Sequence, residues 1–233
     1  METIPLFPLG AVLFPGMVLP LRIFEPRYRS LMTWLLDRPA GTRREFGVVA
    51  IRQGWEVGAD GVGALYPMGC TATLRQSAQL DDGTYEIVTV GTDRFRVIEV
   101  DVGSRPYLLA IVERLPDPVG TAPEVTVLAR SVLTLYRDYL GAMAATALVE
   151  IPGDGQLETL LEDLPDDPLL LASLVASTVP LDLADQQSLL TEPDAVSRLR
   201  AELRLLKREA TMFARLRAVP VPLARLMVPT TLS

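Results

Sequence analysis

Hydrophobic side chains dominate the beginning of the chain, where residues 4–21 include no charged or polar side chain. This run is long enough to cross a membrane as a helix. Its four prolines exclude that helix, because a proline inside a helix removes a hydrogen-bond donor and clashes with the preceding turn. The pattern instead predicts two buried extended segments, at Thr3–Leu9 and Met17–Phe24, joined by a turn at Phe14-Pro15-Gly16.

A helical period follows these segments. Pro26 suits the first position of a helix, because its φ angle is already helical and its missing N–H would have no partner there. We therefore predict a helix from Pro26 to about Leu36. The apolar residues of its buried face lie three or four positions apart, namely Tyr28, Leu31, Met32 and Leu35.

Short β-rich segments occupy the chain as far as residue 115. Alternation of apolar and polar residues from Cys70 to Arg75 predicts a strand with one buried face, and we expect Cys70 to be a small buried hydrophobe. Asp81-Asp82-Gly83 is typical of a tight hairpin turn, since such turns need positive φ angles. The other expected strands are Gly47–Arg52, Tyr85–Val90, Arg94–Val102 and Pro106–Leu115. Short strands with one inserted helix predict a β-barrel-like domain.

Beyond the linker Pro116–Gly120 the hydrophobic period becomes helical. A helical bundle is predicted from the segments Pro123–Met143, Pro168–Ser177, Leu183–Leu190 and a long terminal helix that Asp194 caps and that reaches Arg217. The apolar residues of the long helix form a heptad-like seam: Val196, Leu199, Leu203, Leu206, Ala210 and Phe213.

These patterns together predict an α+β fold in two parts. The β-rich subdomain is expected at residues 1–117 and the helical subdomain at residues 121–217. An apolar, proline-containing tail remains at residues 218–233. Its prolines exclude a helix, so the tail is expected to be either disordered or docked in extended form.

Two long blocks of the sequence resemble a known family. The segment PLFPLGAVLFPGMVLPLRIFEPRYRSLM, residues 5–32, is similar to the opening of the N-terminal, substrate-binding domain of Lon proteases. The block GCTATLRQSAQLDDGTYEIVTVGTDRFRV, Gly69–Val97, resembles the later part of that domain, including its G-x-x-R-F-R segment. The resemblance extends to about Leu216. The chain looks like a stand-alone version of this domain, without the ATPase and protease parts of Lon.

The residue types present limit the chemistry. The sequence has no histidine, which removes Ser-His-Asp and Cys-His catalysis and histidine metal sites. Its single cysteine excludes an internal disulfide and a multi-cysteine zinc site. Its one lysine, Lys207, follows no P-loop glycine pattern, and a charged helix face does not supply the burial that activates a catalytic lysine. We predict no catalytic residues, no metal and no cofactor.

Charge and leader signals bear on partners and location. The net charge of −7 argues against nucleic acid as the main partner. Glu2 is the only charge before the apolar run, so the basic region of a signal peptide is missing. Together with the excluded membrane helix and the single cysteine, this predicts a cytoplasmic protein with no membrane partner.

Two groups of side chains are candidates for a binding surface. An extended peptide could lie along a strand edge with its side chains among apolar residues, and the candidates are Phe7, Phe14, Leu19, Leu21, Trp55 and Tyr66. Arginines offer a planar fork that could clamp a carboxylate, and the candidates are Arg22, Arg29, Arg94 and Arg96.

The arginines also have a structural interpretation. Glu25 and Arg29 are four residues apart and could pair along the helix. Arg94 and Arg96 alternate with Phe95, so they are expected on the opposite strand face, solvated or paired with a carboxylate such as Glu86.

The resemblance implies a non-catalytic module that binds protein or peptide, as a substrate-recognition domain does in protein quality control. We expect its partner to be an extended or unfolded polypeptide. A separate protease or ATPase and a second copy in a homodimer are left open as further partners. The alternative hypothesis is a regulatory domain that binds a small molecule in a pocket on the β subdomain.

Overall fold

The chain folds into two compact units. The first unit comprises Met1–Pro116 together with Leu183–Thr191, and the second comprises the described residues of Asp117–Asp182 and those from Glu192 onward. The computed structural model describes residues 1–39, 41–52, 64–120, 122–145 and 164–216. Trp55 and the tail at 218–233 lie outside these residues.

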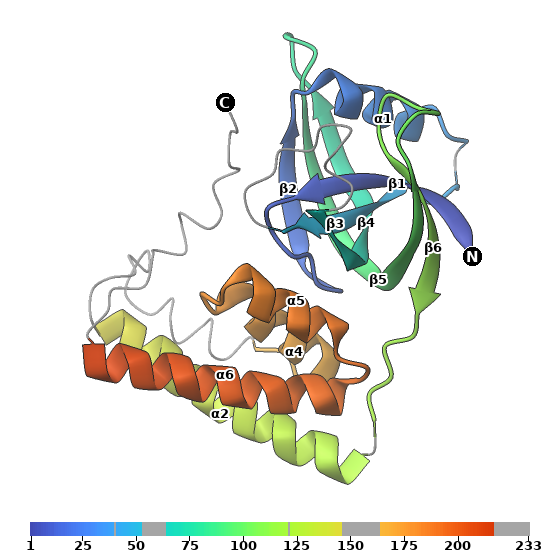
Figure 1. Cartoon of the computed structure of the whole chain (residues 1–233). Helices are drawn as coiled ribbons and strands as arrows, with labels where there is room; N and C mark the ends of the chain where they lie inside the picture. Colours follow the sequence, from blue (N-terminus) through green and yellow to red (C-terminus); the bar gives the residue numbers. More distant parts are fainter. Residues whose placement is uncertain (40, 53–63, 121, 146–163, 217–233) are drawn as a thin grey trace. The chain divides into compact units, whose positions relative to one another are not determined.

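Six strands form one mixed sheet in the first unit (Figure 1). They are β1 (Glu2–Leu9), β2 (Val18–Ile23), β3 (Glu45–Ile51), β4 (Leu65–Gln79), β5 (Tyr85–Asp101) and β6 (Leu109–Leu115). The hydrogen-bonded order is β2-β5-β4-β3-β1-β6, and β5 also pairs with β6. Of the ladders between these six strands, the β1–β3 ladder is parallel and the others are antiparallel. Pairing therefore joins β1, β3, β4, β5 and β6 in a closed cycle, and β2 extends it along the first part of β5.

The helix α1 (Pro26–Leu36) is inserted between β2 and β3, with the bounds that the sequence predicts. Its four expected apolar residues are all buried in the core of the first unit. The ring of Phe7 on β1 stacks on the ring of Tyr28, with centroids 4.0 Å apart. Cys70 on β4 is fully buried in the same core, as expected. The α+β class is thus confirmed, with mainly strands before residue 116 and helices after it.

β5 is one long strand, whereas the sequence pattern predicts two strands, Tyr85–Val90 and Arg94–Val102, with a break at residues 91–93. The N–H of Gly91 donates to the oxygen of Met17 at 2.9 Å, so pairing with the segment before β2 continues there. A Cβ atom at residue 91 would collide with the main-chain oxygen of Phe14. Glycine at this position therefore permits a close backbone approach and does not end the strand. The predicted break is wrong for this reason.

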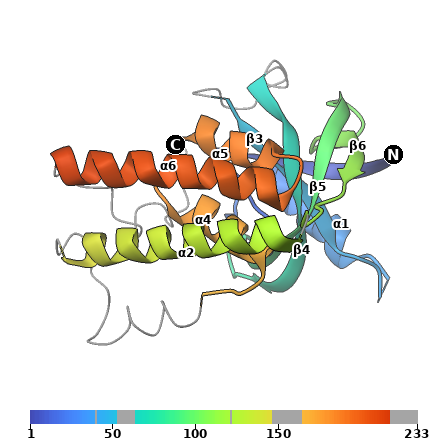
Figure 2. The ribbon, with the colours of Figure 1, turned by 90° about the horizontal axis from the view of Figure 1, so that it is seen from below.

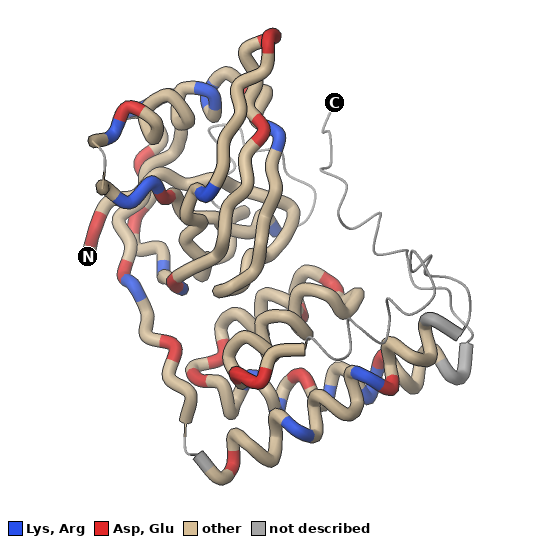
Figure 3. The backbone as a smooth tube through the Cα atoms, turned by 180° about the vertical axis from the view of Figure 1, so that it is seen from behind, with Lys and Arg blue, Asp and Glu red and all other residues tan. Residues whose placement is uncertain are grey.

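The predicted hairpin between β4 and β5 is confirmed. The N–H of Leu80 donates to the oxygen of Thr84 at 2.9 Å, and the N–H of Gly83 donates to the oxygen of Leu80 at 2.9 Å. Gly83 has a φ angle of 75°, which side chains with a Cβ rarely adopt. Asp82, next to it, belongs to the acidic tip of this hairpin (Figure 3).

Among the described residues, three helices build the core of the second unit: α2 (Ala122–Ala145), α4 (Pro168–Thr178) and α6 (Ala195–Leu216). α2 and α6 lie side by side (Figure 2). Asp194 caps α6 as predicted, because its Oδ1 accepts the N–H of Ser197 at 2.7 Å. The predicted seam of α6 faces this core, with Leu199 and Leu206 fully buried.

None of the helices in the described residues combines the length and the apolar composition that crossing a membrane requires.

Candidate functional site

β2 is the end strand of the sheet. In the part of the chain that the structure describes, it pairs with β5 alone. Along a strand of an antiparallel pair, the N–H and C=O groups of successive residues point alternately toward the partner strand and away from it. The hydrogen bond from Gly91 to Met17 sets the phase, so Leu19, Leu21 and Ile23 turn their main-chain groups to β5. Their neighbours Val18, Pro20 and Arg22 direct theirs to the open edge.

Both half-buried and exposed apolar side chains border this edge. Leu19 and Leu21 are half-buried against the core of the first unit. Val18 keeps 63% of its surface exposed, and Pro20 is also exposed. Phe24, directly after the strand, is 44% exposed. An open strand edge flanked by apolar side chains matches the requirements of an extended peptide.

Some of the apolar residues predicted for a binding surface are buried in the core, and others reach the surface. Phe7 and Phe14 are buried in the core and present no surface to a ligand. Their burial has a physical reason: the opening stretch supplies the inner layer of the sheet, where Phe7 stacks on Tyr28. Leu19 and Leu21 do reach the surface, at β2. Tyr66 is half-buried on β4 under the guanidinium of Arg52, 5.0 Å from its ring centroid.

The four arginines do not form one clamp. Arg22 and Arg29 both approach the β4–β5 hairpin: Arg22 lies 3.7 Å from Asp82, and the Arg29 guanidinium lies where a Cβ at Gly83 would stand. Hydrogen bonds from Thr84, with smaller contributions from these two arginines, lower the pKa of Asp82. Arg96 forms an ion pair with Glu113 at 3.4 Å, at a different place on the sheet.

The structural alternatives need two corrections. Glu25 pairs with Arg27 at 2.6 Å, and Arg29 lies against the hairpin instead. Arg94 is not solvated, since it is only 2% exposed. Its guanidinium donates to two carbonyl oxygens, which strand alternation does not predict.

Arg94 fixes the helix α5 (Leu183–Thr191) to the sheet within the first unit. Its Nη1 donates to the oxygen of Leu190 and its Nη2 to the oxygen of Pro116, both at 2.9 Å. Leu190 lies in the last turn of α5, where carbonyl groups lack helical partners and a positive charge is favoured. Gln187 adds a hydrogen bond from its Nε2 to the oxygen of Met68 at 3.0 Å. Arg94 is therefore a structural residue.

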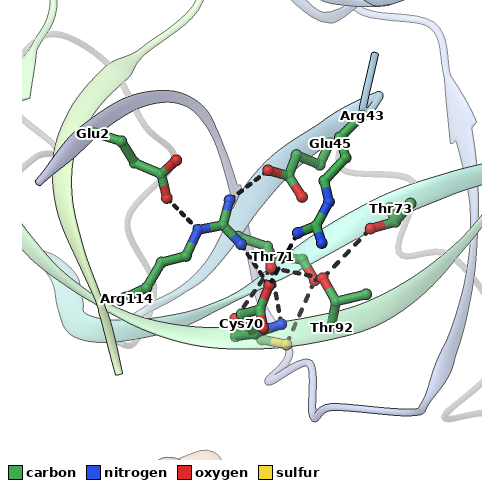
Figure 4. Close-up of polar contacts among 9 residues, drawn as sticks. Glu2, Arg43, Glu45, Cys70, Thr71, Thr73, Thr92 and Arg114 are labelled. Atoms are coloured by element: carbon green, nitrogen blue, oxygen red, sulfur yellow. Dashed lines mark hydrogen bonds and ion pairs between the residues drawn. The ribbon is translucent and has the colours of Figure 1, made fainter. Parts of the chain in front are cut away.

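A second polar cluster, missed by sequence reasoning, surrounds Arg114 on β6 (Figure 4). Its guanidinium forms ion pairs with Glu2 on β1, Glu45 on β3 and Asp93 on β5. Burial alone would lower the pKa of Arg114, but hydrogen bonds to Glu2 and Glu45 raise it. Thr71 continues the cluster by accepting the N–H of Asp93 at 3.0 Å. With Thr71 on β4, the cluster ties five strands together, which suits a structural role.

Among the described residues, the first unit is thus a mixed sheet with the helices α1 and α5, and β2 is its end strand, while the second unit is built from helices. The chain belongs to the family of the ATP-dependent protease La (LON) substrate-binding domain, whose family model matches residues 3–208. The predicted resemblance is confirmed.

Several relatives are similar over most of this chain. It is 30% identical over 214 residues to Lon protease 2 of Sorangium cellulosum (strain So ce56), covering 89% of this chain and 25% of that protein. It is also 30% identical to Lon protease 2 of Myxococcus xanthus, covering 89% and 24%. The chain therefore spans about a quarter of the length of these curated relatives.

Two solved structures are similar as well. One is a Lon N-terminal domain protein from Xanthomonas campestris, with a TM-score of 0.59 and 27% identity, covering 89% of this chain and 98% of that chain. The other is the N-terminal domain of Mycobacterium avium complex Lon protease, with a TM-score of 0.63 and 18% identity, covering 88% and 98%. The second likeness concerns the fold alone.

Proposed function

We propose that this protein is a non-catalytic module that binds extended or unfolded polypeptide along the open edge of β2. The single observation that carries the proposal is the outward main chain of Val18, Pro20 and Arg22, which has no strand partner among the described residues. Membership of a substrate-binding domain family supports a recognition role. An extended chain is the ligand whose own N–H and C=O groups match a strand edge.

The side chains beside this edge would supply the remaining contact. A bound segment would continue the sheet beyond β2, so that alternate side chains pack over the half-buried Leu19 and Leu21. Phe24 offers an apolar contact at the end of the strand. Arg22 offers a positive charge that is half exposed. Affinity is expected to be micromolar or weaker, because ordering a flexible client offsets much of the contact energy.

The absence of cleavage is also part of this proposal. The sequence has no histidine, and its one lysine, Lys207, is exposed on α6. An exposed lysine lacks the burial that activates a catalytic lysine. The protein would therefore hold its client for other factors, and a separate ATPase or protease is the kind of factor that we propose receives it.

We also propose an architecture for each of the two units. We describe the first unit as barrel-like, supported by the closed cycle of strand pairing. We describe the second unit as a helical bundle, supported by the core that α2, α4 and α6 share.

Fluorescence anisotropy with a labelled polypeptide tests the proposed binding. The probe is reduced, carboxymethylated α-lactalbumin, which cannot fold, and the comparison is the native, disulfide-bonded form. We expect saturable binding of the unfolded form only. A parallel incubation with casein, followed by gel electrophoresis, should show no cleavage.

A pair of variants locates the site. Phe24→Ser should weaken binding several-fold, because it removes an exposed apolar contact beside β2. Val127→Ser, which changes a side chain that is 65% exposed on α2, should leave binding unchanged. Equal binding of folded and unfolded α-lactalbumin, or no binding of either, would contradict the proposal and favour the small-molecule alternative.

A further inference from the structure

The open edge of β2 carries more acceptors than donors. Val18 and Arg22 each direct one N–H and one C=O outward, because they alternate with the residues that face β5. Pro20 occupies the position between them and has no N–H. The middle of this edge therefore offers a carbonyl group alone.

This gap affects possible occupants unequally. An extended segment from another protein loses one hydrogen bond when it pairs along Val18, Pro20 and Arg22, whichever direction it runs. A second copy of β2, paired antiparallel around a twofold axis, places Pro20 opposite Pro20. Both hydrogen bonds of that central pair are then missing. Proline on an edge strand is a known means of preventing edge-to-edge association.

We propose that Pro20 makes this edge a transient site for extended polypeptide segments and prevents β2 from pairing with a second copy. The inference rests on the proposed function, because it assumes that a polypeptide pairs along β2. It adds which residue sets the strength of that pairing and which occupant is disfavoured. The number of outward N–H groups on β2 then adjusts an affinity to which the apolar side chains beside the edge also contribute.

A short series of variants changes that number in both directions. Pro20→Ala adds an outward donor, and Val18→Pro removes one, while neither touches the main-chain groups that bond to β5. Val18→Ala is the matched control, because it shortens the exposed side chain of Val18 and keeps the donor. Affinity is measured by anisotropy with labelled, carboxymethylated α-lactalbumin, and self-association by analytical ultracentrifugation of the full chain.

The affinity for the unfolded probe should increase with the number of outward N–H groups on β2. Pro20→Ala should bind the unfolded probe about 2- to 12-fold more tightly, and Val18→Pro more weakly by a similar factor, as expected for one net hydrogen bond. Val18→Ala should bind like the wild type. Pro20→Ala should also self-associate at concentrations at which the wild type remains monomeric.

Three results would overturn the inference. Binding of the probe with equal affinity to Pro20→Ala, Val18→Pro and wild type would remove the role of Pro20 and leave the proposed function intact. Absence of binding in every variant would remove both. A wild-type dimer that Val18→Pro dissociates, without any binding of the probe, would make a second copy the occupant. If Val18→Pro fails to fold by circular dichroism, the Pro20→Ala comparison alone decides.

Discussion

A carboxyl group without a hydrogen-bond partner is buried in the second unit. Glu202 on α6 is 1% exposed, and neither of its side-chain oxygens has a partner among the described residues. Burial raises the pKa of Glu202 well above its ordinary value, although the charge of Arg198 partly opposes the shift. Arg198 itself is fully buried and forms an ion pair with Asp117 at 3.1 Å. The folded protein therefore favours the protonated form of Glu202 more than the unfolded chain does.

The stability of the protein should depend on pH through this group. A glutamate side chain in an unfolded protein has a pKa of about 4.3. Below that pH both the folded and the unfolded state hold the proton, so Glu202 does not lower the stability. Above it, the folded state keeps a proton that the unfolded state releases. Stability therefore falls as the pH rises from that value toward the raised pKa of the folded state.

Glu202→Gln should abolish this dependence, because glutamine has a similar shape and no titrating proton. Thermal midpoints followed by circular dichroism from about pH 4 to pH 9 provide the measurement. The variant should be relatively more stable toward the alkaline end. Glu99→Gln, at an exposed position on β5, is the control and should retain the wild-type profile. Parallel profiles for wild type and Glu202→Gln would show that Glu202 is not protonated on folding.

Among the elements, α6 combines an apolar seam with a charged face. Leu206 is 1% exposed in the core of the second unit, and Leu203 is packed against that core but only partly buried. Lys and Arg residues recur along the helix (Figure 3), and four of them are exposed: Arg200, Arg204, Lys207 and Arg208. The seam therefore stabilises the helix through tertiary packing within its own chain, as helices in compact domains usually require.

Truncating the seam should destabilise the protein. Leu206→Ala should lower the free energy of unfolding by about 2–5 kcal/mol, the usual range for a fully buried leucine. Leu203→Ala should cost less, and Arg204→Ala, at an exposed position, should change little. Urea denaturation provides the values. Unchanged stability together with loss of a dimer would mean that the seam pairs between molecules.

For the molecule as a whole, the order of the helices along the chain does not match their division between the two compact units. α5 lies between α4 and α6 in the sequence, yet it belongs to the unit that contains the sheet. Its attachments are side-chain hydrogen bonds to main-chain oxygens, from Arg94 to Leu190 and from Gln187 to Met68. Local opening of proteins follows such cooperative units more closely than sequence neighbours.

Hydrogen exchange should therefore separate the helices into two groups. Arg94→Met removes the donor that satisfies the end of α5 and should accelerate exchange in α5. Leu206→Ala should accelerate exchange in α2, α4 and α6 and leave α5 protected. Arg96→Met, next to Arg94 on the same strand but exposed, is the matched control and should change neither group. Equal acceleration of α5 by Leu206→Ala would show that the units open together.

Local signals were sufficient for much of this architecture. Pro26 determines where α1 begins, Gly83 specifies the hairpin, and Asp194 caps α6, because each acts on main chain within a few residues of itself. The burial of Cys70 was predicted as well, but the prediction of one buried face is wrong here, because Thr71 on the opposite face is also fully buried. The absence of histidine and the single lysine are facts of composition, so the restriction on catalytic chemistry required no structure.

Contacts between distant residues were decided only by the tertiary structure. Arg94 and its acceptor Leu190 are 96 residues apart, so no local pattern distinguishes this buried arginine from its exposed neighbour Arg96. Gly91 resembles a strand break until the approach of Phe14 explains it. The edge of β2 was likewise decided by the tertiary structure. Hydropathy predicts the strand, but only its place at the end of the sheet leaves the main-chain groups of Val18, Pro20 and Arg22 without a strand partner among the described residues. Sequence patterns report the local chain, whereas burial and edge position depend on which distant segments pair.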